Sequence, residues 1–386
     1  MASPRAVTAA SASPAAATAS RQLTLGRWRV PVVLPNRRDP RLKVSAVIIT
    51  LQVLGQTVLN FKVSIAQILV SIAVCAIIDL AVGFRHQRVL AWPASGLLTG
   101  NGVGFILRAS GTQHGDWWSL HGIGYFVLAA VVSMAAKHLI RPAGRHLLNP
   151  SNAGLVLCLL VIGPAHVFPQ YLYWGPIGIP VVLALAVIVV GAASILRTIH
   201  MLPMALSFLV AFTSLIAVFA LTGRSFVAIW HDGAISGASY WLHICTSPEL
   251  FIFVFFMMSD PQTAPRSGLG RIIYGATTAV IAAALTFFQT TEFGIKLAIL
   301  SGLTVVCALV PLIELAARRI TASGEPGPGL APDSRPLSSR LAAALNPATI
   351  AVVIIALTAV AGTAALANDK EVIAIELGLT GKRNPQ

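Results

Sequence analysis

The chain has 386 residues, of which 56% are hydrophobic and only 10% are charged, and its mean hydropathy is +0.80. Soluble globular proteins carry about 25% charged residues, so this composition excludes a soluble enzyme, a disordered chain and a disulfide scaffold. At about 20 residues for each crossing, the apolar residues suffice for about ten transmembrane helices. The sequence therefore predicts an all-α polytopic protein whose first partner is the lipid bilayer.

The basic excess indicates topology rather than nucleic-acid binding. There are 27 Lys and Arg against 13 Asp and Glu, which gives a formal net charge of +14. Cytoplasmic loops of membrane proteins collect Lys and Arg, so we expect these side chains to mark the inner segments and predict no nucleic-acid partner. The four cysteines form no C-x-x-C pair, which favours buried thiols over a disulfide or a metal site. They are Cys75, Cys158, Cys245 and Cys307.

Eleven apolar segments follow a polar N-terminal region. We predict a disordered basic tail over 1–43, a ten-span membrane domain over 44–316 and a cytoplasmic linker over 317–346. An appended transmembrane helix over 347–367 and a C-terminal tail over 368–386 complete the expected organisation. The expected spans are 44–61, 63–84, 89–107, 119–138, 151–163, 177–196, 202–222, 242–259, 271–289, 296–316 and 347–367.

The distribution of charge gives these spans a direction. With the N-terminus in the cytoplasm, twenty of the 27 basic residues fall in inner segments and seven in outer segments. This bias follows the positive-inside rule. We therefore expect a multi-pass protein of the cell membrane with a cytoplasmic N-terminus and, if the eleventh span crosses, a C-terminus outside.

Two of the expected spans are unlike simple hydrophobic rods. Asn149–Pro150 opens a run of only about ten apolar residues, and Ser247–Pro248 opens another that ends at Asp260. A polar residue followed by Pro is typical of a helix start. Because the threading sends the two segments in opposite directions, we predict half-helices from an inverted repeat. An ordinary proline kink is the alternative.

Two small-residue or amide-rich places could bind a ligand. The segment 92–104 holds seven small or hydroxyl residues together with Asn101, which indicates either close glycine packing of helices or a ligand face. Asn149 and Asn152 lie at a helix start, where they either cap the helix or donate hydrogen bonds to a heterocycle.

Three acids mark a third place. Acidic groups in or near the hydrocarbon zone are costly, so they are functional candidates by default. We predict that Asp232 in an outer loop, Glu249 at the start of a half-helix and Asp260 at its end frame one site. Their alternative roles are a turn residue, a partner of the helix dipole and a helix stop.

The motifs at these positions resemble the NqrB/RnfD family, the membrane subunits of a sodium-pumping quinone reductase and of the Rnf ferredoxin:NAD oxidoreductase. The resemblance rests on LLTGNGVGF, NPSNAG, SGAS and FFMMSDPQTAPRSGLGRIIYG, and it covers Leu42 to Glu314. Within the family, the chain is most similar to RnfD-like proteins of actinobacterial enediyne biosynthetic clusters. That closer likeness rests on RRDPRLKV, LGQTVLNFKVS, WPASGLLTGNG and HLLNPSNAGLVL.

The resemblance implies ten spans in two inverted five-helix repeats, and it implies flavin. Family members carry FMN as a phosphoester on the last residue of an S-G-A-T motif on the outer side. The matching run here ends at Ser239, and Asp232 corresponds to the upstream acid that a flavin-attaching enzyme recognises. Serine stands where threonine is usual, and Asp232 lies one residue farther upstream than is common. The matching run is Ser236-Gly237-Ala238-Ser239.

A flavin ring needs an apolar slot with aromatic walls. We expect Trp230, Tyr240, Trp241 and Phe251 to supply them, and a second, non-covalent riboflavin is also implied by the resemblance. The chain has no ferredoxin-type cysteine run or dinucleotide fingerprint, so redox partner subunits would have to deliver and remove electrons. The cofactor-binding candidates are Ser239, Ser236, Gly237, Ala238, Asp232, Asn149, Asn152, Glu249, Asp260 and Thr263; we assign no catalytic residue and no metal ligand.

The resemblance implies a flavin-dependent protein of transmembrane electron transfer, a subunit of a membrane redox complex. The closer likeness to the enediyne-cluster proteins alone implies a role in enediyne natural-product biosynthesis. A transporter or permease without redox chemistry is one alternative, because inverted repeats are also the architecture of many carriers. A flavin-free accessory protein for export or self-resistance on the same fold is the other.

Overall fold

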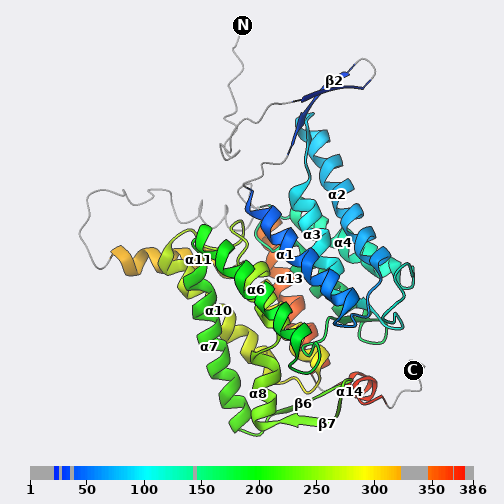
Figure 1. Ribbon diagram of the computed structural model, residues 1–386. Coiled ribbons are helices and arrows are strands. Elements are labelled where there is room, and N and C mark those ends of the chain that lie inside the picture. The colour runs from blue at the N-terminus through cyan, green and yellow to red at the C-terminus, as the bar shows by residue number, and fades with distance from the viewer. Residues whose placement is uncertain are drawn as a thin grey trace.

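The computed structural model describes residues 21–25, 28–34, 39–141, 146–322, 347–367 and 369–378. Most of these residues are helical, and the helices pack side by side in one bundle (Figure 1). Much of the predicted tail and linker lies outside the described residues, as does the end of the predicted C-terminal tail. The affected positions are 1–20, 26–27, 35–38, 323–346, 368 and 379–386.

Each of the eleven predicted spans coincides with a helical segment. In the described part of the chain, seven helical segments are long and apolar enough to cross a membrane, and two shorter apolar helices, Ile123–Leu139 and Pro150–Ile162, accompany them. The prediction of a mostly helical, multi-pass membrane protein is therefore confirmed. The helices are α1 (Pro40–Thr57), α2 (Ile65–Gln87), α3 (Ala94–Ile106), α4 (Ile123–Leu139), α5 (Pro150–Ile162), α6 (Ile179–Thr198), α7 (Leu202–Leu221), α8 (Gly237–Cys245), α9 (Pro248–Ile252), the π-helix η2 (Phe253–Met257), α10 (Gly268–Thr286), α11 (Glu292–Ala322), α13 (Pro347–Leu366) and α14 (Lys370–Glu376).

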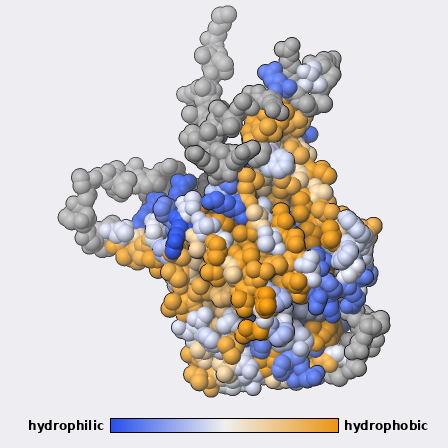
Figure 2. All heavy atoms as spheres, viewed as in Figure 1, coloured by the Kyte–Doolittle hydropathy of each residue, from blue (hydrophilic) through white to orange (hydrophobic). Residues whose placement is uncertain are grey.

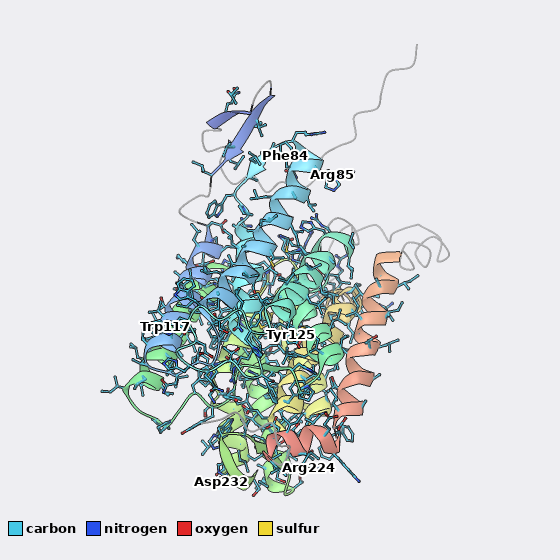
Figure 3. The ribbon with its side chains drawn as sticks, turned by 90° about the vertical axis from the view of Figure 1, so that its right-hand side faces the viewer. Phe84, Arg85, Trp117, Tyr125, Arg224 and Asp232 are labelled. Atoms are coloured by element: carbon cyan, nitrogen blue, oxygen red, sulfur yellow. The ribbon has the colours of Figure 1, made fainter. Side chains whose placement is uncertain are left out.

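The bundle has two polar ends separated by an apolar belt (Figure 2). One end carries the N-terminal strands and the C-terminus of α2, and we call it the hairpin end. The other end carries α14 and strands β6 and β7, and we call it the α14 end (Figure 1). Arg85 lies at the hairpin end, whereas Asp232 and Arg224 lie at the α14 end (Figure 3). The predicted alternation of inner and outer segments corresponds to these two ends; which of them faces the cytoplasm stays a prediction.

Several helix starts follow from local sequence. Ser64 and Gln67 form a capping box at the start of α2. The Ser64 side chain accepts the backbone N–H of Gln67, and the Gln67 side chain accepts the backbone N–H of Ser64. Asn149 caps α5 and accepts the N–H of Asn152 at 3.1 Å, and Pro150 occupies the first helical position, as predicted.

The glycines of the predicted segment 92–104 lie in α3 and allow it to pack closely on α2. A Cβ added to Gly100 would lie 2.6 Å from the Cα of Ile72, and one added to Gly104 would lie 2.9 Å from the Cα of Ile68. Backbone of α2 therefore occupies the space that side chains would need. For these positions the structure supports the helix-packing alternative.

A buried ion pair adds to the contact of α2 with its neighbours. The Nζ of Lys137 on α4 lies 2.6 Å from Oδ1 of Asp79 on α2, and the N–H of Gly96 on α3 donates to Oδ2 of Asp79 at 3.0 Å. One carboxylate thus joins three helices near the hairpin end.

Part of the predicted disordered tail is ordered. Strands β1 (Arg21–Leu25) and β2 (Trp28–Val33) pair antiparallel, and β2 also pairs with β3 (Leu90–Ala91) before α3. Helix α1 begins at Pro40, inside the predicted tail, with Asp39 as its cap. The expectation of disorder over 1–43 is wrong for these residues, because an alternating apolar stretch finds a partner strand far along the chain.

Short strand pairs cover the α14 end. Strand β4 (Leu107–Ala109) continues α3 and pairs antiparallel with β5 (Val167–Pro169), which follows α5. Strands β6 (Ser225–Ala228) and β7 (His231–Ser236) form a hairpin between α7 and α8. Asp232 lies in β7, where the sequence predicted a loop.

The predicted span 242–259 is broken. Helix α8 ends at Cys245, and α9 starts anew at Pro248 with Ser247 accepting the N–H of Glu249 at 3.2 Å. The segment then widens into η2 and ends at Met257. The helix start predicted at Ser247–Pro248 is confirmed.

The eleventh span is not a detached appendage. Helix α13 packs against α11, α10 and α5. The side chain of Gln289 donates to the Thr363 carbonyl at 3.1 Å, and the hydroxyls of Ser301 and Thr363 lie 2.9 Å apart. The expected linker over 317–346 begins inside α11, and the expected tail after 367 contains α14. The four cysteines are free and buried, as predicted.

Candidate functional site

The predicted flavin-acceptor segment forms the junction of β7 and α8. Gly237 has φ +58°, a left-handed conformation that favours glycine, and it turns the strand into the helix. Ser236 and Ser239 are exposed. Among the described residues, none forms a hydrogen bond with either hydroxyl, and Ser236 does not cap α8 with its side chain. The Ser239 hydroxyl is thus free to react at the first turn of a helix.

An aromatic cluster lies one helical turn from Ser239. His243 follows Ser239 by four positions, so both lie on one face of α8. The ring of His243 contacts Trp230 at 5.1 Å between centroids, and Trp230 stacks on Tyr173 at 4.7 Å. All three rings are half-buried, so their cluster offers an accessible aromatic surface beside the acceptor hydroxyl.

The other predicted aromatic walls have separate partners. Tyr240 is buried against Phe226, and the indole N–H of Trp241 donates to the Thr213 carbonyl at 2.9 Å. Phe251 stacks on Phe255. These contacts do not bring the four predicted rings into one slot; of the four, Trp230 alone joins the cluster near Ser239.

Glu249 lies at the first turn of α9, as predicted, and is buried with a partner that the sequence reasoning missed. Its Oε2 lies 2.9 Å from Nζ of Lys296 on α11, and Lys296 also donates to the Gln170 carbonyl. Within the described residues, Oε1 of Glu249 has no hydrogen-bond partner. A small cavity of about 20 Å³ borders both side chains, which suffices for one water molecule.

The buried network continues toward the α14 end. One turn before Lys296, Glu292 accepts the indole N–H of Trp230 at 2.7 Å and the N–H of Leu172. The N–H of Phe293 donates to Oε1 of Glu376 on α14 at 2.8 Å. The spacing E-x-x-x-K at the start of an apolar helix could have revealed Glu292 and Lys296, whereas Glu376 arrives from a segment predicted as a tail.

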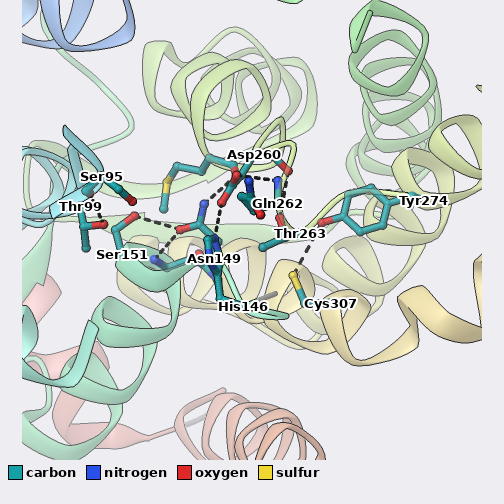
Figure 4. A network of polar contacts seen from close by, with 12 residues as sticks. Ser95, Thr99, His146, Asn149, Ser151, Asp260, Gln262, Thr263, Tyr274 and Cys307 are labelled. Atoms are coloured by element: carbon teal, nitrogen blue, oxygen red, sulfur yellow. Dashed lines mark hydrogen bonds and ion pairs between the residues drawn. The ribbon is translucent and has the colours of Figure 1, made fainter. Parts of the chain in front are cut away.

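Asn149 and Asp260 meet at the hairpin end (Figure 4). The side-chain amide of Asn149 donates to the Met257 carbonyl at 2.9 Å, and Nε2 of His146 lies 3.3 Å from Oδ2 of Asp260. The carboxylate also accepts the N–H of Gln262 at 2.9 Å. The sequence analysis treated the Asn149 segment and the Asp260 segment as two separate candidate sites. In the structure they adjoin, because Asn149 at the start of α5 bonds to Met257 at the end of η2.

Asn152 and Thr263 have structural partners. The Asn152 side-chain amide donates to the Leu300 carbonyl and to the Thr304 hydroxyl, each at 2.9 Å, and so links α5 to α11. The Thr263 hydroxyl donates to the Asp260 carbonyl at 3.2 Å, which closes the turn after η2. Both residues are buried.

The three acids therefore do not frame one site. Asp232 is exposed at the α14 end (Figure 3), Glu249 is buried inside the bundle, and Asp260 joins the network at the hairpin end. The prediction failed because Glu249 and Asp260 lie at opposite ends of one helical segment, which α9 and η2 form together. Ser247 at the start of α9 donates to the Leu172 carbonyl at 2.9 Å, near the α14 end, and η2 ends beside the start of α5.

A cavity of about 950 Å³ opens at the α14 end. Its walls come from the α1–α2 loop, β4 and the turn after it, residues 164–171, β7 and α14. Asp232 lines it, whereas Ser239 does not. A volume of this size is in the range of sites for small organic ligands.

A protein-family model matches part of this chain. No curated protein matches it, but residues 166–322 match the model of the NQR2, RnfD, RnfE family. The matched segment includes β7, α8, α9, η2 and α11, and it therefore contains the SGAS run and the phenylalanine- and methionine-rich motif. Over these residues the chain is a membrane protein similar to the NqrB/RnfD family, whose members generally work in electron-transport complexes.

Proposed function

We propose that this protein is a flavin-binding membrane subunit of an electron-transfer complex, with FMN attached through Ser239. The observation that carries the proposal is the free, exposed Ser239 hydroxyl at the first turn of α8, in a run that corresponds to the family's acceptor motif. A helix N-terminus favours a phosphate group, because its N–H groups and dipole are complementary to negative charge. The unused N-cap position at Ser236 leaves these N–H groups available.

Attachment would form a phosphoester. The bond between the Ser239 oxygen and the flavin phosphate would form as the pyrophosphate bond of a flavin dinucleotide breaks, with a nucleoside monophosphate leaving and the hydroxyl proton passing to solvent. A separate flavin-attaching enzyme would catalyse this transfer. Asp232, exposed on β7, would be accessible to that enzyme.

The aromatic cluster fits the flavin ring. Tyr173, Trp230 and His243 form a half-buried surface one turn along α8, where a planar isoalloxazine could pack. The indole N–H of Trp230 is bonded to Glu292, so the platform is connected to the buried ionisable network. The bound flavin would supply the redox chemistry, while these residues hold its ring and exclude water.

Electron transfer across the membrane would require redox partner subunits, since the chain carries no motif for another redox centre. The opposite directions of α5 and α9 support the inverted-repeat architecture that the resemblance implies. A second flavin, riboflavin, and a role in enediyne biosynthesis belong to the same proposal and rest on the motif resemblance alone.

In-gel flavin fluorescence of the denatured full-length protein tests covalent attachment. We expect a fluorescent band for the wild type co-expressed with the attaching enzyme, its loss in Ser239→Ala and its retention in Ser236→Ala, a matched control in the same run. A dark wild-type band under these conditions contradicts covalent FMN. A Ser239→Ala variant that keeps full activity in cells would favour the transporter alternative.

A further inference from the structure

The cavity at the α14 end has a buried arginine in its wall, and this arginine forms no salt bridge within the described residues. Arg108 on β4 is only 6% exposed, and its guanidinium carbon lies 3.9 Å from the centre of the Tyr171 ring. Its Nε donates weakly to the Lys62 carbonyl at 3.4 Å. Within the described residues, no carboxylate forms an ion pair with it, and its Nη1 has no hydrogen-bond partner.

A second cation and a free hydroxyl lie on the same wall. Lys62 lines the cavity beside Arg108, and burial together with the positive charge of Arg108 lowers the pKa of Lys62. The Ser110 hydroxyl, two residues beyond Arg108, is buried without a partner within the described part of the chain. Electrostatic attraction to the buried Glu249 and Glu292 offsets part of the burial cost of Arg108. Its Nη1 group and the Ser110 hydroxyl still have no hydrogen-bond partner within the described residues, so this wall is complementary to an anion that accepts hydrogen bonds.

Acidic side chains from β7 and α14 line the same cavity. They are Asp232 on β7 and Glu371 on α14, and within the described residues neither acid pairs with Arg108 or Lys62. A ligand that satisfies both the cations and the acids would have an anionic group at one end and hydrogen-bond donors at the other.

We propose that this cavity binds a small phosphate ester, with the phosphate against Arg108, Lys62 and Ser110 and a donor-bearing end toward Asp232 and Glu371. Two adjacent cations match the charge of a phosphate better than that of a single carboxylate, and the arginine fork matches its oxygens. Phosphoethanolamine has this chemistry, and it occurs either as a soluble molecule or as the head group of a membrane lipid. The site is separate from the flavin attachment, because Ser239 does not line the cavity.

The experiment measures the thermal unfolding midpoint of the full-length protein in detergent during titration with phosphoethanolamine. Sodium chloride at matched ionic strength serves as the blank, and a Ser239→Ala background removes covalent flavin. We expect a concentration-dependent rise of the midpoint and at least about tenfold weaker binding in Arg108→Gln, because a charged hydrogen bond is lost. Lys62→Gln is the second variant, should the first fold poorly.

Arg224→Gln is the matched control. Arg224 also lies at the α14 end over an aromatic ring, with its guanidinium carbon 3.7 Å from the centre of Phe287, but it does not line the cavity. It should therefore bind phosphoethanolamine like the wild type. Equal binding by Arg108→Gln, Lys62→Gln and wild type, or equal protection by succinate, would overturn the proposal.

A second measurement distinguishes the two sources of the ligand. The phosphatidylethanolamine retained by purified wild type and Arg108→Gln is quantified by mass spectrometry. Less retained lipid in the variant identifies the head group as the ligand, whereas equal retention with a lost response to phosphoethanolamine identifies a soluble ester. The absence of both effects refutes the site, and the fate of flavin on Ser239 does not affect this outcome.

Discussion

Glu376 is a buried acid that forms no ion pair with a cation among the described residues. Its Oε1 accepts a hydrogen bond from a backbone N–H. Its Oε2 has no hydrogen-bond partner within the described residues. Burial, followed by repulsion from Glu292, raises the pKa of Glu376 well above its usual value near 4.5. The folded protein therefore favours the protonated acid.

This shift predicts how stability depends on pH. An acid with a raised folded pKa contributes its stabilisation fully below the unfolded pKa, near 4.5, and loses it as the pH rises toward the folded pKa. Between these two pKa values, the free energy of unfolding of the wild type should fall by about 1.4 kcal/mol for each pH unit. We expect Glu376→Gln to abolish this fall, because glutamine does not ionise. The thermal midpoint of wild type and variant, measured from pH 4.5 to 8, checks it. Parallel curves for the two proteins would refute the assignment.

Single residues also show where sequence reasoning succeeds. Asn149 and Ser247 were predictable as caps, because a cap is a local pattern of a polar residue before proline. Arg108 and Glu376 were not, since the groups that they contact lie more than forty positions away in the sequence, such as the Lys62 carbonyl for Arg108. Lys296 looked like a topology marker at a span end, yet it is buried in an ion pair.

At the scale of elements, the approach of α3 to α2 depends on glycine. A side chain at Gly100 would meet the α2 backbone at Ser71 and Ile72, and backbone cannot move aside as a side-chain tip can. The hydrogen bond from Gly96 to Asp79 and the Asp79–Lys137 pair hold the same helices together. Displacing α3 would strain both.

We therefore expect Gly100→Ala to destabilise the protein by about 1–3 kcal/mol through overpacking. Gly83→Ala on α2 is the control, because a Cβ there meets nothing within 4 Å; it should be neutral or stabilise by about 0.5–1 kcal/mol. The unfolding midpoints of both variants in detergent measure the difference. Equal midpoints would show that α3 shifts freely.

The elements that were predicted incorrectly share one cause. The hairpin β1–β2 and helix α14 both lie in segments whose composition favours a tail, and each gains order from a distant partner. Strand β2 pairs with β3, and α14 inserts Glu376 at the start of α11. The composition of a segment indicates only whether that segment would be ordered alone. It therefore does not predict order that depends on a partner far away in the sequence.

On the scale of the whole molecule, the chain forms one bundle that includes α13. The eleven predicted apolar spans and the two irregular helix starts coincide with helical segments, because apolar length and proline are local signals; the number of crossings and the direction of each span stay predictions. Sequence reasoning separated the last span from the others only because a Gly- and Pro-rich segment precedes it. The structure shows α13 packed against α11, α10 and α5.

Deletion of residues 347–386 therefore tests the integrity of the bundle. The truncation would expose buried surface on α11 and remove the partners of Gln289, Thr290 and Ser301. We expect little monodisperse protein on size-exclusion chromatography and a lower thermal midpoint in the fraction that remains. A monodisperse truncation with an unchanged midpoint would restore the view of an appended helix.

The short helices α3 and α5 have an electrical consequence. Each has 13 residues and spans about 20 Å, against about 30 Å for the hydrocarbon core of a bilayer. Beyond them, at the α14 end, lies the polar cavity. We call the layer of about 20 Å that α3 and α5 span the septum. If water in this cavity conducts ions, the transmembrane voltage falls across the septum alone, and the electric field in the septum is about one and a half times that in the surrounding bilayer. A charge that crosses only this septum would still gain about 2.3 kcal/mol for each 100 mV, so the energy of that crossing is the same as for a charge that crosses the full thickness of the bilayer.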